Sequence, residues 1–75
     1  MSATRPAAQI MDAYFLETRA KLIEIAANLD RVDRAPDGET LAGDPRRTFI
    51  AQALAILQSP TPHRAERILR LYSLP

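Results

Sequence analysis

The stretch that decides the fold is residues 6–34, PAAQIMDAYFLETRAKLIEIAANLDRVDR. It is rich in Ala, Leu, Glu, Lys and Arg, which are strong helix formers, and it contains no glycine. Pro6 suits the first turn of a helix, where Thr4 would serve as N-cap, and Pro36 disfavours helical backbone at Ala35. We therefore expect one long helix over about residues 6–34.

This helix is apolar on two sides. One set of residues, which we call the seam, follows the alternating four/three spacing of a coiled coil: Met11, Phe15, Thr18, Leu22, Ile25, Leu29 and Val32. A second set, the strip, lies about 100–140° around the helix and consists of Leu16, Ala20, Ile23 and Ala27. A helix that is apolar on two sides must pack against another surface on each side. The rest of the chain is large enough to cover one of these sides. We therefore expect a partner, most simply a second copy.

Two shorter helices follow a polar connection over residues 36–43. Asp44 is placed as an N-cap and Pro45 as the first helical residue, which predicts a helix over about 45–58. After the break SPTP, Thr61 as a cap and Pro62 as the first residue predict a third helix over about 62–72.

No strand-like alternation occurs, so the sequence predicts an all-α fold in a single domain over residues 1–75. We expect a three-helix bundle in which the long N-terminal helix is the spine and the other two helices form a hairpin over the seam. The strip is then left for an antiparallel homodimer, because a two-fold interface uses the same patch on both subunits.

The composition restricts which classes of protein the chain can belong to. The chain has 75 residues, close to the lower limit for independent folding, and no cysteine, which excludes disulfides and thiolate metal sites. No apolar run reaches the roughly 18–20 residues of a membrane span, and the N-terminus lacks the apolar segment of a signal peptide. We expect a soluble, cytoplasmic protein without a membrane partner.

Polar residues at the edge of the apolar faces are the first candidate site. Asp12, Arg19 and Asp30 fall on one line between the seam and the strip. They are either a recognition stripe, with Arg19 contacting an anion, or ion pairs that fix helix register, within the chain or across a dimer. Tyr14 is either an interface anchor or an aromatic at the edge of the core.

Charge is distributed unevenly along the chain. Residues 1–43 hold five basic and seven acidic residues (net −2), and residues 44–75 hold five arginines and two acids (net +3). The basic surface consists of Arg46, Arg47, Arg64, Arg67 and Arg70. Two helices around a short break superficially resemble a helix-turn-helix, which makes a small nucleic-acid-binding or regulatory protein the alternative function. The Pro-x-Pro break and the missing base-reading side chains argue against a nucleic-acid partner.

The sequence offers no catalytic or cofactor signature. His63 is the single histidine, and its nearest acidic neighbour in the helix, Glu66, gives the order His-x-x-Glu rather than the repeated Glu-x-x-His of di-iron bundles. We expect no metal, no cofactor and no enzymatic activity.

Residues 11–22, MDAYFLETRAKL, continuing through residues 25–31, IAANLDR, resemble short bacterial proteins of unknown function. The likeness lies in the Tyr-Phe-Leu-Glu opening and the Leu-Asp-Arg close, and it implies a small helical bacterial protein without assigning site residues. The function we expect is a non-enzymatic helical interaction or scaffold module, acting through homodimerisation and helix-face contacts, with an unidentified protein partner as a further possibility.

Overall fold

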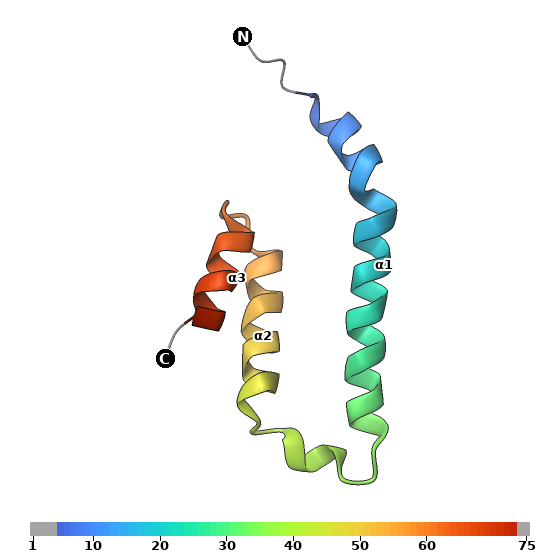
Figure 1. The fold of residues 1–75 in the computed structure, drawn as a ribbon, viewed down its shortest axis with the longest axis vertical. Coiled ribbons are helices and arrows are strands. Elements are labelled where there is room, and N and C mark those ends of the chain that lie inside the picture. The colour runs from blue at the N-terminus through green and yellow to red at the C-terminus, as the bar shows by residue number, and fades with distance from the viewer. Residues whose placement is uncertain (1–4, 74–75) are drawn as a thin grey trace. The chain divides into compact units, whose positions relative to one another are not determined.

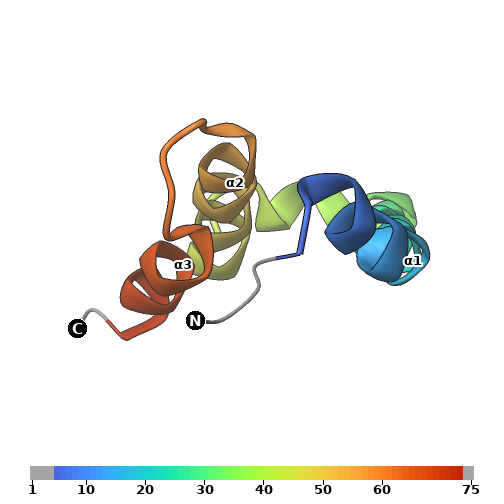
Figure 2. The same ribbon diagram turned by 90° about the horizontal axis from the view of Figure 1, so that it is seen from above.

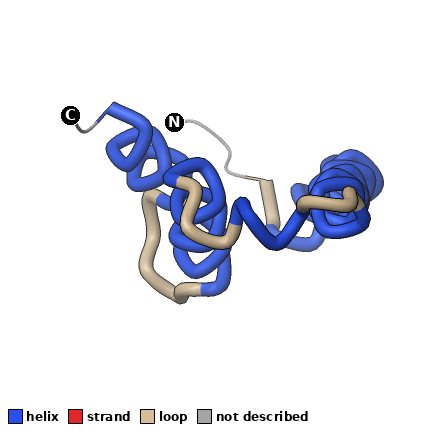
Figure 3. Tube along the Cα trace, turned by 90° about the horizontal axis from the view of Figure 1, so that it is seen from below, coloured by secondary structure: helices blue, strands red, loops and turns tan. Residues whose placement is uncertain are grey.

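The computed structural model describes residues 5–73, and this part of the chain is helical (Figure 1). Its elements are α1 (Ala7–Arg34), a short 3₁₀ helix η1 (Gly38–Leu41), α2 (Pro45–Gln58) and α3 (Arg64–Ser73). Figure 3 shows helices and loops but no strand in the described residues. The predicted all-α class, with one long and two shorter helices, is confirmed. Residues 1–36 and 37–75 form two compact units, each described by itself.

The first unit is built on α1, a single helix of 28 residues. At about 1.5 Å per residue it is about 42 Å long. Pro6 occupies the N-cap position, one residue earlier than the first turn, and its carbonyl accepts hydrogen bonds from the amides of Gln9 and Ile10 at 3.0 and 3.2 Å. The expected cap Thr4 lies outside the described residues. The helix ends before Ala35, whose extended ψ of 147° agrees with the effect of the following Pro36.

The second unit opens with a capped helix start. The Asp44 carboxylate accepts a hydrogen bond from the Arg46 amide at 2.8 Å, and Pro45 is the first residue of α2, as the sequence predicts. The Arg46 side chain adds two contacts to the same carboxylate, from Nε and Nη2, each at 2.9 Å. The predicted end of α2 at Gln58 is also confirmed.

The predicted start of the third helix is wrong by two residues. Pro62 is not the first residue of α3, which begins at Arg64, and the residue before it, His63, has a left-handed φ of 65°. The carbonyl of His63 accepts the first helical hydrogen bond, from the Arg67 amide at 2.9 Å. The Thr61 amide donates to the Ser59 hydroxyl at 3.1 Å, so residues 59–61 form a side-chain turn of their own instead of a helix cap.

Helices α2 and α3 pack against each other, as Figures 1 and 2 both show. Phe49 of α2 and Tyr72 of α3 meet edge to face, with ring centroids 6.0 Å apart and an interplanar angle of 65°. The half-buried apolar residues of α2 and α3 are Phe49, Ile50, Ala53, Leu54, Ile56, Ile68 and Leu71. Among the described residues no apolar side chain is fully buried, so neither unit contains a closed core of its own.

Candidate interaction surfaces

The N-terminal two-thirds of α1 is an open apolar surface. No residue of α1 is buried. Its exposed large apolar side chains range from 39% accessible for Ile10 to 70% for Leu16. They are Ile10, Met11, Tyr14, Phe15, Leu16, Leu22 and Ile23, and all lie within residues 10–23. Because burial of apolar surface is the main favourable term in folding and association, this segment is suited to contact another apolar surface.

Both predicted faces of α1 contribute to this surface. Met11, Phe15 and Leu22 belong to the seam and are 50–62% accessible. In the strip, Leu16, Ala20 and Ile23 are exposed and Ala27 is half-buried. The predicted interface residue Tyr14 is also exposed, at 53%. The assignment of the strip as a dimer interface stays a prediction.

The polar stripe is exposed as well. Asp12, Arg19 and Asp30 are all solvent-accessible, and within the described part of the chain none of their side chains forms a hydrogen bond or ion pair. Asp12 and Arg19 are seven residues apart, a spacing that does not bring side chains into contact on one helix, where partners stand three or four residues apart. The stripe is therefore available to a partner outside its own helix.

Elsewhere on α1 the charges are paired within the helix. Lys21 Nζ lies 2.7 Å from Glu17 Oε2, in the acid-first i,i+4 order that the sequence shows. The hydrogen bond and the opposite charge lower the pKa of Glu17 and raise the pKa of Lys21. Both side chains are well exposed, so this pair contributes little to stability.

Four of the five arginines of the second unit make contacts inside that unit. Arg46 binds Asp44, whose pKa falls to about 2 because the Arg46 side chain and amide hydrogen-bond to its carboxylate. Arg70 Nη2 lies 3.0 Å from Glu66 Oε2, four residues earlier in the same helix. Arg47 is half-buried and also has an interaction partner.

Two further arginines hold the connection between α2 and α3. Arg64 donates from Nε and Nη2 to the Ser59 carbonyl at 2.9 and 2.6 Å. Arg67 Nη1 donates to the Ser59 hydroxyl at 3.0 Å and to the Thr61 carbonyl at 3.3 Å. The sequence did not indicate these contacts, because nothing in its spacing shows that arginines after the break reach back to the end of the preceding helix. These groups are positioned to stabilise the turn, not aligned as a row of free cations.

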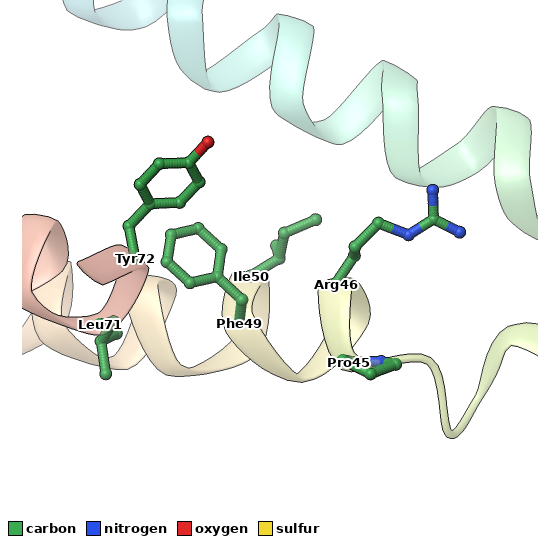
Figure 4. Close-up of a pocket in the computed structure, with 6 residues that line it drawn as sticks. All are labelled: Pro45, Arg46, Phe49, Ile50, Leu71 and Tyr72. Atoms are coloured by element: carbon green, nitrogen blue, oxygen red, sulfur yellow. The ribbon is translucent and has the colours of Figure 1, made fainter. Parts of the chain in front are cut away.

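The second unit also carries an apolar hollow of about 430 Å³, open to the surface (Figure 4). It is lined by Pro45, Arg46, Phe49, Ile50, Leu71 and Tyr72. Its one charged lining group, the Arg46 guanidinium, is bound to Asp44, so the hollow is suited to an apolar side chain. This hollow was not predicted from the sequence.

Within the described residues no group of three or more His, Asp or Glu side chains could hold a metal ion. His63 is exposed at the start of α3. In the same part of the chain no helix is both long enough and apolar enough to cross a membrane.

The chain matches no known protein-family model, and comparison with curated proteins and with solved structures finds no significant similarity.

Proposed function

We propose that this protein is a non-enzymatic helical interaction module that acts by pairing with a second copy through α1. The observation that carries the proposal is that α1 has no buried residue, although seven of its large apolar side chains lie within residues 10–23. Most helical stability in proteins comes from packing of an apolar face and not from intrinsic helix propensity.

The exposed area agrees in size with an interface. Half-exposed aromatic residues such as Tyr14 and Phe15 together offer about 150–250 Å², taking 150–250 Å² for each whole side chain. With the five exposed aliphatic and methionine side chains and a normal polar share, the surface is on the order of 500–900 Å² per chain. A standard interface buries about 800 Å² per partner, so the seam and the strip together hold an apolar area of that order, which the hairpin and a second chain would share.

In the arrangement we propose, the α2–α3 hairpin packs on the seam of α1 to form a three-helix bundle, and the strip meets a second chain. The apolar hollow beside Phe49 and Tyr72 supports a role for the hairpin as a packing surface. The two-fold pairing of one self-complementary helix face supports a homodimer. The composition supports a cytoplasmic location, as the sequence predicts.

The test is the molecular mass by light scattering across a concentration series. We expect a dimer of twice the 8.3 kDa chain mass, which Ile23→Glu in the strip dissociates. The matched control is Asn28→Glu, which adds the same charge to α1 outside the strip and keeps an acceptor for Arg31. A wild-type protein that remains monomeric at every concentration contradicts the proposal.

A further inference from the structure

The strip of α1 has a spacing that an antiparallel mate must match. Leu16, Ala20, Ile23 and Ala27 alternate four and three residues apart, so a large side chain and an alanine take turns along the face. Leu16 and Ile23 are 70% and 56% accessible. In an antiparallel pair each alanine position faces a position of the other class on the second helix. Several registers, one heptad apart, meet this condition, so the apolar pattern does not choose among them.

Two charges beside the strip supply the choice. Arg19 and Asp30 are exposed, and among the described residues their side chains form no hydrogen bond or ion pair. Asp30 continues the line of the strip three residues after Ala27, and Arg19 lies along its edge, directly before Ala20. The two charges have opposite sign but stand too far apart on one helix to meet, because partners there are three or four residues apart.

We infer that two α1 helices pair antiparallel through the strip, in the register that places Arg19 of each copy beside Asp30 of the other. In this register Ile23 of each copy packs on Ala27 of the other. The inference rests on the proposed homodimer through the strip and adds its register and its polar contacts.

The layers on either side of the centre agree with this register. One turn out from Ile23, Ala20 faces Asp30 of the second copy, and the small alanine leaves room for the carboxylate to turn to Arg19. One turn further, Leu16 faces Arg34 of the second copy. The methylene stem of an arginine covers apolar surface while its guanidinium stays in water, so Leu16 is covered without burying a charge.

The opposite edge of the strip gains a second pair of unlike charges. Glu17 follows Leu16 directly, and Arg31 follows Asp30 directly, so both lie on the edge away from Arg19. A two-fold antiparallel pair brings each edge against the same edge of the other copy, which places Glu17 beside Arg31. The Arg31 guanidinium makes one hydrogen bond within α1, at 2.6 Å, and retains further donors for this contact.

The other registers bring like charges together or lose apolar cover. Sliding the pair by one heptad toward the N-terminus lets strip residues face only one another, but it brings Asp12 beside Asp30 of the second copy. On the other edge it brings Glu17 beside Glu24. A second heptad brings Glu17 beside its own counterpart. Sliding in the opposite direction leaves Leu16 beyond the end of the second α1. Because like charges in contact oppose association, charge complementarity fixes the register.

One like-charge contact remains in the chosen register. Glu24 directly follows Ile23 and faces its own counterpart near the two-fold axis. Both carboxylates are exposed, and four contacts of unlike charge in the same dimer outweigh this one. Glu24→Gln should therefore tighten the dimer modestly.

The test is a charge exchange read out by dimer dissociation on dilution in low salt, followed by light scattering. Arg19→Asp places aspartate beside Asp30 of the other copy, and Asp30→Arg places arginine beside Arg19. We expect each variant alone to weaken the dimer about tenfold, and less at high salt. An equal mixture of the two variants should recover wild-type affinity as a heterodimer, because each chain then carries the charges that the other lacks. The double exchange in one chain should recover it as well.

Asp12→Arg is the matched control. It changes the charge as Asp30→Arg does and lies along the same edge as Arg19, but in this register it faces no residue of the second α1, which ends at Arg34. It should leave the dimer unchanged, and circular dichroism of each variant checks that α1 keeps its helix content. In the neighbouring register both Asp12→Arg and Asp30→Arg would tighten the dimer, because each removes a contact between two aspartates.

The outcomes separate the register from the proposed function. A tighter dimer with Asp30→Arg, or a mixture that does not recover, overturns the register. Single exchanges without effect on a dimer that Ile23→Glu dissociates also overturn it, while the strip remains the interface. A monomeric wild type contradicts the proposed function itself.

Discussion

Arg64 closes the turn between α2 and α3 by donating two hydrogen bonds to the carbonyl of Ser59, the residue that follows the last turn of α2. The carbonyls at the C-terminal end of a helix lack partners in the helix itself and carry a partial negative charge. A forked guanidinium satisfies such a site better than a single ammonium group.

The first prediction concerns this contact. Arg64→Lys retains the charge but loses the fork, so we expect it to lower the free energy of unfolding by about 1 kcal/mol, measured by urea denaturation at fixed protein concentration. Arg70→Lys is the matched control, because the Arg70–Glu66 pair is exposed and should contribute little. Equal effects of the two substitutions contradict the role given to Arg64.

The second prediction concerns the aromatic contact between α2 and α3. Phe49 is half-buried and Tyr72 is 79% accessible, so most of the buried ring area belongs to Phe49. We expect Phe49→Ala to destabilise the second unit by about 2 kcal/mol and Phe49→Leu by clearly less, because leucine keeps most of the apolar volume. Thermal unfolding followed by circular dichroism measures the loss of stability in both variants. A smaller loss for Phe49→Ala than for Tyr72→Ala would contradict the larger contribution assigned to Phe49.

A third prediction follows from the N-cap of α2. The ordinary aspartate pKa of 3.8 applies to the unfolded chain, and in the folded chain the pKa of Asp44 falls to about 2. A carboxyl with a lowered pKa in the folded state stabilises that state above the unfolded pKa and loses this contribution as the pH falls. We expect this contribution to be complete above about pH 4 and to disappear as the pH falls through about 2.

The measurement compares Asp44→Asn with the wild type in thermal melts from pH 5 to 2. Asparagine is an equally good N-cap without a charge, so the variant should keep helix α2 and lose part of the acid dependence. Asp44→Ala should lower the melting temperature at every pH. An identical pH profile for the wild type and Asp44→Asn rules out the lowered pKa.

The fourth prediction concerns the left-handed backbone of His63. Histidine tolerates a positive φ better than most residues, and a β-branched residue tolerates it poorly. We expect His63→Val to cost about 1–2 kcal/mol of stability and His63→Gly to be neutral or stabilising. Urea denaturation at the same protein concentration gives the free energy of unfolding of both variants. Equal values would contradict a strained backbone at His63.

The elements that could be predicted from the sequence are those with local causes. Asp44 and Pro45 set the start of α2 through a side chain and a fixed φ that act within three residues, and the structure confirms that boundary. The i,i+4 pair of Glu17 and Lys21 likewise depends only on helix geometry.

The start of α3 could not be predicted in the same way. Thr61 and Pro62 resemble a cap and a first helical residue, but the backbone there is fixed by contacts from Arg64 and Arg67, whose reach depends on how the chain turns. The apolar hollow beside Phe49 was missed for a related reason, since it arises where two helices diverge and no residue spacing encodes it. The apolar faces of α1 could be predicted from the spacing of its residues. The surface that packs on them could not, because it depends on residues outside this helix.

If α1 pairs with a second copy, as we propose, its helical order depends on the concentration of the protein. If its helical order depends on pairing, a chain at low abundance spends more of its time with this segment frayed, and dilution alone lowers its helix content. Proteases cleave such opened segments in proportion to how often they open. Degradation would then remove unpaired monomers faster than dimers. The cellular concentration of the protein would depend on this degradation as well as on its synthesis.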